Sequence, residues 1–489
     1  MTVSPELNRA QVKIQSPNNN LKNSTSKISV NGRIQVSKKG WAVRIAILAV
    51  TVLFLTPRFY TGFDLNDPFI VYSTLAPAIT IVMLVGAWCW YRNPAKGKAG
   101  NDLVSVIIPV YNQKDMIEIV IDAIYRSTYK NIEVIATNDG SNDGTKEILD
   151  NLTKKYPTLQ VIHQKRGGKR KASATGFYAS KGRYLVHIDS DSVIDEQAIA
   201  EFVKTFNANP KVGSLAGETR AWNAEKNILT RLQDAWYNIS CNISKAYESS
   251  FKSVTCCSGC LSAFRREAIA NFMPYWANTN THSGGGVDRE LTAYIIASKE
   301  VRNDMVQTLW PSSALKQKLM ESTSKYDDSD DRLLSAHSLM KWESVYVATA
   351  IVYVDAQETL KKFLKQQTRW KKGFLRTNFY LSTYFWRGRH PLASIVYYLE
   401  FMTGLTQSLI ILTVLFYEPF IMNDFWTPVY FMGGLIFSSL AHGLDLKLRH
   451  PSSKNWLYMP LMNLIGTFVL SWLLFYALWT FKNNSWLTR

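Results

Sequence analysis

The sequence predicts an α/β domain built on a doubly wound mixed sheet, accompanied by α-helical transmembrane and interfacial segments. Three observations predict this fold class. Five long apolar runs lie toward the two ends of the 489-residue chain. Between them, short β-branched runs alternate with segments of helical spacing, which is the order of elements in a doubly wound sheet. Polar motifs follow several of the short runs directly, where such sheets bind their ligands.

The composition favours a membrane protein and argues against two other classes. Hydrophobic residues make up 47% of the chain and charged residues only 19%, although the formal net charge is +18. A chain this apolar can bury a core, which excludes disorder as its main state. The cations flank the apolar runs and form no single basic stripe, so we expect no nucleic-acid partner.

The long apolar runs predict the helices that cross the lipid bilayer. Each run is long enough, or nearly so, to cross a hydrocarbon layer of roughly 30 Å. We expect two transmembrane helices within residues 41–91, and transmembrane or re-entrant helices within residues 391–480. The runs themselves cover residues 41–56, 69–91, 391–416, 426–443 and 456–480.

Basic residues predict the orientation of these helices, because the cytoplasmic flanks of membrane spans carry an excess of Lys and Arg. Residues 1–40 form a polar tail, expected to be disordered, with seven basic residues against one Glu. Arg92, Lys96 and Lys98 follow the second run. We therefore expect a multi-pass protein of the plasma membrane whose central segment is cytoplasmic. The last apolar run has basic flanks on both sides, which leaves a full crossing and a re-entrant course open.

The central segment contains four short apolar runs that are typical of buried parallel strands. Segments of helical spacing separate them, and such a sheet binds its ligand at the carboxyl ends of its strands. The expected strands are 104–110, 132–136, 159–162 and 184–188, and the expected helices cover 117–125, a segment through Leu149, and about 170–180.

Polar motifs with suitable chemistry stand at the ends of these strands. Asp139 ends the second strand, and Asp189 and Asp191 follow the fourth. Two carboxylates one residue apart suit a divalent cation that a diphosphate also binds. A Gly-Gly turn leads to Lys169 and Arg170 at the start of a helix, which is a phosphate site on physical grounds.

A basic amphipathic stretch follows the α/β segment. Residues 355–388 are expected to form interfacial helices, because Lys and Arg alternate there with apolar residues, as in a helix that lies on a membrane surface. The stretch contains Gln366, Arg369 and Trp370. An acidic motif with Asp330 and Asp331 precedes it.

Together these motifs resemble those of the processive inverting glycosyltransferases of family 2, over about residues 40–489. The resemblance rests on Asp139, Asp189-x-Asp191, Asp331 and Gln366-x-x-Arg369-Trp370 between membrane runs. It implies a GT-A-type catalytic domain at residues 101–345. It also implies an enzyme, a hexosyltransferase that takes UDP-sugar donors, extends a polysaccharide acceptor on the cytoplasmic face and moves the polymer across the bilayer.

Several motifs resemble class I hyaluronan synthases in particular, which implies UDP-GlcNAc and UDP-GlcA as donors. Leu487 replaces a Gly and Cys260 replaces a Pro of that pattern, which leaves open a chitin or chitooligosaccharide synthase that uses UDP-GlcNAc alone. A non-catalytic scaffold or transporter would be expected to lose acidic motifs, and all are present. The motifs are Gly167-Gly168-Lys169-Arg170, Cys257-Ser258-Gly259, Asp330-Asp331-Arg332, QQTRW at 366–370, and Trp486-Leu487-Thr488-Arg489 within an expected gating motif at 481–489.

The resemblance implies a role for each matching residue on the donor side. Asp139 would contact the nucleotide, and Lys169 and Arg170 would contact the diphosphate. Asp189 and Asp191 would hold Mg²⁺ or Mn²⁺ on that diphosphate.

On the acceptor side, Asp331 would be the general base, with Asp330 beside it. Gln366, Arg369 and Trp370 would frame the end of the acceptor. The remaining implied substrate-binding residues are Cys257, Ser258 and Gly259, together with Trp486 and Arg489, which would close over the nucleotide.

Asp288 competes with Asp331 for the role of general base. The segment Gly286-Val287-Asp288-Arg289 also resembles the family's acidic motif. Separation from Cys257 along the chain favours Asp288, whereas separation from Gln366 favours Asp331. We assign the base to Asp331, which makes about residues 280–320 an insertion, and we keep Asp288 as the alternative.

Overall fold

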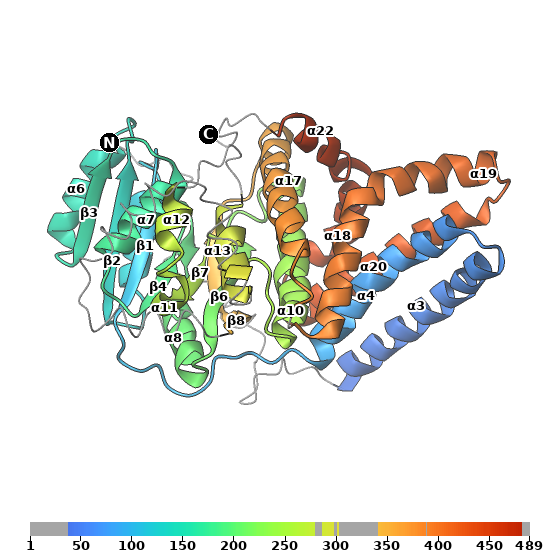
Figure 1. The fold of residues 1–489 in the computed structure, drawn as a ribbon, viewed down its shortest axis with the longest axis horizontal. Coiled ribbons are helices and arrows are strands. Elements are labelled where there is room, and N and C mark those ends of the chain that lie inside the picture. The colour runs from blue at the N-terminus through green and yellow to red at the C-terminus, as the bar shows by residue number, and fades with distance from the viewer. Residues whose placement is uncertain (1–37, 279–285, 298–300, 303–340, 388, 482–489) are drawn as a thin grey trace.

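The computed structural model describes residues 38–278, 286–297, 301–302, 341–387 and 389–481. An α/β domain stands beside a bundle of long helices that project away from it (Figure 1). Helix α17 (Leu360–Ser382) lies between these two parts.

The α/β domain is built on one mixed eight-stranded sheet of order β3-β2-β1-β4-β7-β6-β8-β5. The first four of these strands are parallel, and β7 is antiparallel to both of its neighbours. The chain winds from β1 outward to β3 and returns to β4 on the other side of β1, so a topological switch point lies between β1 and β4. The predicted doubly wound sheet is confirmed. The strands are β1 (Val104–Val110), β2 (Ile132–Asp139), β3 (Leu159–Gln164), β4 (Tyr184–His187), β5 (Val193–Ile194), β6 (Val212–Ala221), β7 (Ser262–Arg265) and β8 (Glu343–Val354).

Helices cover both faces of the sheet, which explains why the residues of its central strands β1 and β4 are almost all buried. Val106 and Ile108 of β1 belong to a core shared with α5 and α8. Ile107, between them, belongs to a second core on the other face, with α7, α11 and α13. The helices of the domain are α5 (Ile117–Tyr125), α6 (Thr145–Lys155), α7 (Lys169–Ala179), α8 (Ala198–Ala208), α9 (Ile228–Asn238), the π-helical segment η1 (Ile239–Lys245), α10 (Ala246–Ser250), α11 (Arg266–Ile269), α12 (Met273–Asn278) and α13 (Val287–Ile296).

Two expected boundaries differ from the structure. Strand β8 pairs with β6 as far as Val354, so the sheet continues past residue 345. Helix α13 falls within the expected insertion at 280–320, yet its Leu291 and Ile295 are buried in the core of the domain. Helix α13 is therefore part of the packed domain, and its assignment to an insertion stays a prediction.

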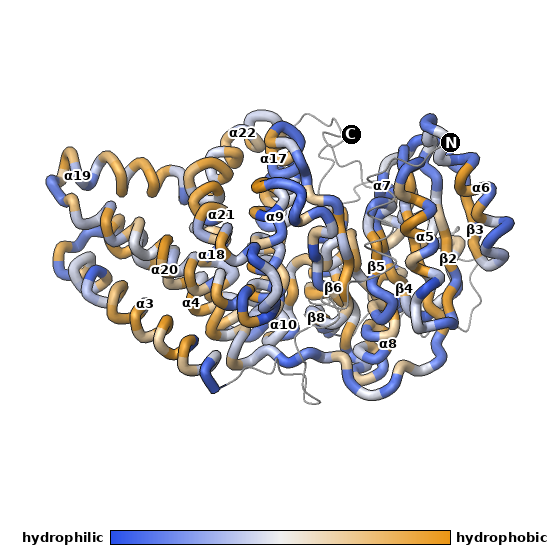
Figure 2. The backbone as a smooth tube through the Cα atoms, turned by 180° about the vertical axis from the view of Figure 1, so that it is seen from behind, coloured by the Kyte–Doolittle hydropathy of each residue, from blue (hydrophilic) through white to orange (hydrophobic). Residues whose placement is uncertain are grey.

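Five helical segments of the described chain are long and apolar enough to cross a membrane. Figure 2 shows the apolar residues concentrated along them. They correspond to the five predicted runs and extend most of them at one or both ends. The segments are α3 (Lys38–Asp64), α4 (Pro68–Cys89), α18 with η2 and α19 (Pro391–Phe420), α20 (Trp426–Arg449), and η3, α21, η4 and α22 (Asn455–Trp479).

The last of these segments returns to the interfacial helix. Leu474 and Ala477 of α22 (Leu473–Trp479) pack on Leu375 of α17, and the two helices lie side by side (Figure 1). The Nζ of Lys372 donates to the carbonyl oxygen of Thr480 at 2.5 Å. The apolar bundle thus ends against the basic helix α17.

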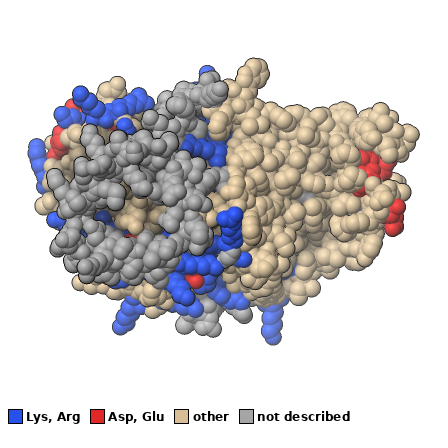
Figure 3. Space-filling view, viewed as in Figure 1, with Lys and Arg blue, Asp and Glu red and all other residues tan. Residues whose placement is uncertain are grey.

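Charged side chains are distributed unevenly over the surface. Lys and Arg gather over the α/β domain and at its junction with the bundle, whereas the broad side of the bundle is uncharged and acidic side chains mark its far end (Figure 3). Exposed Asp64 lies at the end of α3, and exposed Lys38 and Lys39 lie at its start. The bundle therefore has a basic end near the sheet and an acidic end away from it.

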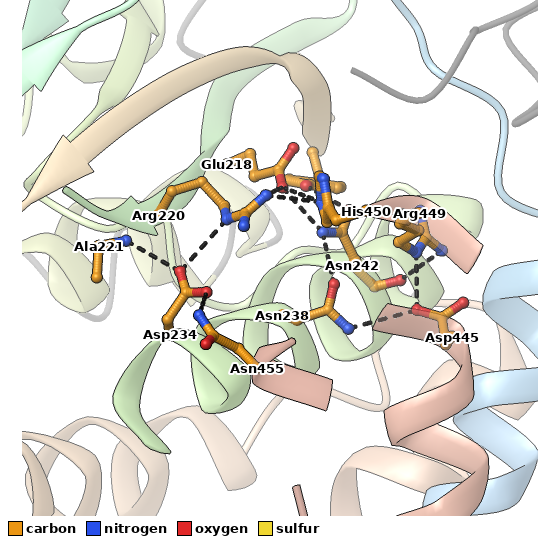
Figure 4. Close-up of polar contacts among 11 residues, drawn as sticks. Glu218, Arg220, Ala221, Asp234, Asn238, Asn242, Asp445, Arg449, His450 and Asn455 are labelled. Carbon is orange, nitrogen blue, oxygen red and sulfur yellow. Dashed lines mark hydrogen bonds and ion pairs between the residues drawn. The ribbon is translucent and has the colours of Figure 1, made fainter. Parts of the chain in front are cut away.

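Buried ions join the α/β domain to the bundle (Figure 4). Asp445 of α20 is fully buried and accepts hydrogen bonds from Arg449 Nε at 2.7 Å and from Trp88 Nε1 at 2.6 Å. Arg44 of α3 lies 3.7 Å from the same carboxylate. Asn238 of α9 donates to it at 3.4 Å, so one buried charge links three apolar helices to the domain.

A second buried carboxylate continues the connection (Figure 4). Asp234 of α9 accepts from Asn455 Nδ2 at 2.8 Å and from Arg220 Nε of β6 at 3.4 Å. Arg220 also lies 3.9 Å from Glu218 and 2.7 Å from Nε2 of His450, which follows α20. Strand β6 is thereby held against both ends of the α20–η3 connection.

Candidate active site

Asp139 organises the turn that leads into α7. Its Oδ1 accepts hydrogen bonds from Gln164 Nε2 and the Gly167 N–H, and its Oδ2 accepts from the Gly168 N–H, all at 2.7 Å. Gly168 has φ +90°, a conformation that favours glycine. The carboxylate thus holds the loop that presents Lys169; the expected contact with a nucleotide stays a prediction.

Lys169 reaches the end of β4. Its Nζ lies 2.6 Å from Asp189 Oδ1 and 3.8 Å from Asp288 Oδ1. The ammonium is partly withdrawn from water, but the two carboxylates outweigh this burial and raise its pKa. Lys169 therefore stays protonated, and three of the candidate groups meet at one point.

Arg170 does not join them, contrary to the expectation. Its guanidinium is buried on the other side of α7, where Nη2 lies 2.7 Å from Glu290 and Nη1 donates to the carbonyl oxygen of Trp276 at 3.2 Å. Successive residues of a helix point in different directions, and here Lys169 turns to Asp189 whereas Arg170 turns to Glu290. Arg170 instead fixes α12 and α13 to α7.

Asp189 and Asp191 follow β4, as predicted. The Asp189 side chain is 32% exposed, so its carboxylate is accessible to a ligand in front of the sheet. Carboxylate oxygens are the ligands that Mg²⁺ and Mn²⁺ prefer, and this donor pair fits such an ion when a diphosphate completes its coordination. No group of three acidic, His or Cys side chains forms a complete metal cage within the described ranges.

Asp355, which sequence reasoning missed, lies beside this pair. Burial, Glu358 and Asp191 raise its pKa to about 6. The sequence did contain a signal for this residue, because Asp355 directly follows the apolar run of β8. In a similar way, Asp139 ends β2 and Asp189 follows β4. Asp355 therefore adds negative charge near Asp191.

Asp288 lies at the centre of the site. It stands in the first turn of α13, after Gly286, whose φ is +89°. Burial raises the pKa of Asp288, Lys169 opposes that effect, and the negative charge of Asp189 adds to it. The positive charge of Arg369 on α17 also lowers the pKa of this carboxylate. The fold therefore brings the alternative base Asp288 to Lys169 and Asp189.

The loop 257–260 forms the wall beside Asp288. A methyl group added at Gly259 would lie 2.6 Å from both Asp288 carboxylate oxygens and from Lys169 Nζ, so a larger residue would displace these two side chains. Ser258 accepts a hydrogen bond from Lys245 Nζ at 2.8 Å. Cys257 is fully buried: its N–H donates to Thr292, and its Sγ lies 3.5 Å from Ser344 Oγ, so it supports the loop and does not face a ligand.

Helix α17 carries the remaining described candidates. Trp370 packs beside Trp236, with ring centroids 5.7 Å apart, and contacts the cluster that contains Tyr237. Gln366 is 9% exposed, and its Oε1 is buried without a hydrogen-bond partner among the described residues. An unsatisfied buried amide oxygen is costly, which favours a polar ligand at this position.

Four predicted residues lie outside the described ranges. They are Asp330 and Asp331, assigned to the base, and Trp486 and Arg489 of the gating motif.

Comparisons with known proteins show which proteins the chain is similar to. The sequence model described as Glycosyl transferase family 2 matches residues 105–272. A hyaluronan synthase of Streptococcus pyogenes is 26% identical over 419 residues, which is 84% of this chain and 89% of that protein. An N-acetylglucosaminyltransferase of Azorhizobium caulinodans is 23% identical over 393 residues, with 79% and 87% covered. A solved structure of a Pyrobaculum calidifontis mannosyltransferase in complex with GDP-Man and Mn2+ has a TM-score of 0.49 at 17% identity, covering 86% of this chain and 97% of that one.

Proposed function

Since the chain is a family 2 glycosyltransferase similar to hyaluronan synthases, we propose that it polymerises UDP-sugars processively and extrudes the product through its membrane helices. The proposed product is hyaluronan, made from UDP-GlcNAc and UDP-GlcA. The observation that carries this proposal is the convergence of Lys169, Asp189 and Asp288 beside Gly259. The similarity to an N-acetylglucosaminyltransferase supports the alternative, a chitin or chitooligosaccharide synthase that uses UDP-GlcNAc only.

Asp288 is the proposed general base. The proton of the acceptor hydroxyl passes to its carboxylate while the acceptor oxygen bonds to the anomeric carbon, and the bond from that carbon to the diphosphate breaks. A raised pKa suits this role, because it makes the carboxylate a stronger base than an ordinary aspartate. Attack from the face opposite the diphosphate inverts the anomeric configuration.

The diphosphate leaves beside Lys169, whose ammonium stabilises the developing negative charge. Asp189 and Asp191 would hold a Mg²⁺ or Mn²⁺ ion, which would supply further positive charge to the same group. Arg170 has no part in this step, because Glu290 and Trp276 occupy its guanidinium.

The acceptor is proposed to lie along α17. Trp370 offers an aromatic ring for stacking on a sugar, and Gln366 Oε1 offers an unsatisfied acceptor. Arg369 completes the expected frame. Closure of Trp486 and Arg489 over the nucleotide stays a prediction, and the return of α22 to α17 supports it.

The uneven surface charge supports a cytoplasmic catalytic domain. Basic residues gather at the end of the bundle near the sheet and acidic ones at the far end (Figure 3). The positive-inside rule then places the α/β domain in the cytoplasm and the acidic end outside, which suits a plasma-membrane enzyme that exports its product.

Separate substitutions of the two candidate bases test the proposal. Asp288→Asn keeps the shape of the side chain and is expected to lower the rate of UDP release by about 10²- to 10⁴-fold, the usual contribution of a general base. Asp331→Asn is expected to keep most of the activity, and exposed Asp150→Asn serves as the matched control. An active Asp288→Asn enzyme with an inactive Asp331→Asn enzyme would return the base to Asp331.

The product is identified by supplying the donors separately and together. We expect a polymer that requires both UDP-GlcNAc and UDP-GlcA and is degraded by hyaluronidase. A chitinase-sensitive product from UDP-GlcNAc alone, unaffected by UDP-GlcA, would establish the alternative.

A further inference from the structure

Lys245 is a buried cation that forms no ion pair with the residues that the structure describes. It ends the π-helical segment η1 and is 6% exposed. Its Nζ donates to Ser258 Oγ at 2.8 Å and lies 3.8 Å from Cys241 Sγ. No carboxylate of the described residues lies within ion-pair distance of it. Glu248, three residues along the helix, is held instead by the N–H and hydroxyl of Thr255.

An isolated buried ammonium costs several kcal/mol, because the protein interior solvates it poorly. A hydroxyl and a thiol compensate only part of that cost. Helix segments of the π type also recur at functional sites, where they displace one residue of a regular helix. Both features suggest that the missing anion belongs to a ligand.

The surroundings of Lys245 place that anion on the acceptor side of the site. Its hydrogen-bond partner Ser258 precedes Gly259, which lies against Asp288 and Lys169. Cys260 is in the same loop, and it lies close enough to Lys245 and Asp189 that the charges of both affect the pKa of its thiol. Cys241 and Cys260 in turn lie near Tyr237, which shares a cluster with Trp370.

We propose that Lys245 is a specificity-determining residue that pairs with the carboxylate of a uronic acid unit at the end of the acceptor. This inference rests on the proposed function and names the charge that the second sugar brings to the site. Lys169 already serves the diphosphate at the Asp189 end, whereas Lys245 contacts the loop through Ser258. A charge-assisted hydrogen bond to the uronate would distinguish it from a neutral sugar of the same shape.

The experiment compares Lys245→Met, Lys245→Arg and the matched control Lys252→Met. Lys252 pairs with Glu343 at 2.9 Å and is 49% exposed, so its loss removes an exposed cation that already has a counter-charge. UDP release and polymer length are measured with UDP-GlcNAc alone, with UDP-GlcNAc and UDP-GlcA, and with UDP-Glc in place of UDP-GlcA. UDP-Glc is the probe because it differs from UDP-GlcA only in carrying a hydroxymethyl group in place of the carboxylate.

Lys245→Met is expected to slow polymerisation from the two natural donors by about 10- to 100-fold, as for the loss of one hydrogen bond between charged groups. UDP release from UDP-GlcNAc alone, and incorporation of Glc, are expected to change little, so that discrimination between GlcA and Glc falls. Lys245→Arg is expected to restore most of the rate. Replacing a buried cation by an apolar residue of similar volume is generally tolerated by the fold.

Three results would overturn the inference. An equal loss of UDP release from UDP-GlcNAc alone would assign Lys245 to the diphosphate or to the fold. Unchanged discrimination between GlcA and Glc would remove the uronate as its ligand. If Lys245→Met does not fold, failure of folded Lys245→Arg to polymerise GlcA would also refute it. A wild-type enzyme that never incorporates GlcA would instead refute the hyaluronan proposal itself.

Discussion

The buried ions at the junction predict how much the stability of the α/β domain depends on one carboxylate, that of Asp234 (Figure 4). Asp234 is 2% exposed and accepts hydrogen bonds from the Ala221 N–H, Arg220 and Asn455. Asp234→Asn keeps the volume of the side chain but leaves Arg220 with only part of its counter-charge. The change therefore isolates the electrostatic contribution of the connection between β6, α9 and η3.

The size of the effect follows from what Arg220 retains. Removing one partner of a buried ion pair typically costs about 3 to 5 kcal/mol. Glu218 remains 3.9 Å from Arg220, and the Arg220 side chain is 17% exposed, so the low end applies. We expect a loss of about 3 kcal/mol, which corresponds to a melting temperature lower by roughly 6 °C if the α/β domain unfolds as one unit.

Thermal unfolding of the detergent-solubilised protein, followed by far-UV circular dichroism, measures this loss. Glu118→Gln is the control, because it removes an exposed partner of Lys155 at 3.7 Å and is expected to change stability by less than about 0.5 kcal/mol. The double variant Asp234→Leu with Arg220→Met removes both charges and is expected to be more stable than Asp234→Asn. The reasoning fails if Asp234→Asn and Glu118→Gln melt within about 1 °C of each other.

Two further predictions concern the active site. Gly259→Ala is expected to reduce UDP release by more than about 10-fold without unfolding the protein, because the methyl group forces Asp288 and Lys169 apart. The control is Gly466→Ala, where a methyl group meets no atom within 4 Å. Equal activity of the two variants would contradict the packing argument. The pH dependence of kcat/KM is expected to fall on the acidic side with a pKa above that of an ordinary aspartate, because protonation of Asp288, whose pKa is raised by burial, removes the base. Lys169→Met is expected to move the acidic limb of the pH profile to higher pH, because Lys169 lowers the pKa of Asp288. If the limb does not move, the group that titrates there is not Asp288.

The sequence was sufficient to predict the features that depend on neighbouring residues along the chain. The strands that carry Asp139 and Asp189 are continuous apolar runs bounded by polar turns, and the membrane helices are long apolar runs. Both patterns depend on neighbours along the chain, so periodicity is enough to find them. The carboxyl ends of parallel strands meet at one edge, which is why these carboxylates were expected together.

Side-chain direction and long-range packing were not available from the chain alone. Lys169 and Arg170 are adjacent and chemically alike, yet the helical period turns one to Asp189 and the other to Glu290. The sequence left Asp288 and Asp331 as alternatives, since separation along the chain does not measure distance in space. Packing of α13 on the sheet brings Asp288 to Lys169, whereas Asp331 lies outside the described residues.

By itself the sequence determined the class of chain: an α/β transferase domain with acidic strand ends, flanked by apolar helices with a basic side. The tertiary structure decided which groups meet. It placed Lys245 behind the Ser258 loop and buried the ions that join β6 to α20, contacts between residues far apart in the chain. Such contacts form because burying apolar faces brings distant segments together, and charge pairing then selects among the polar groups carried inside.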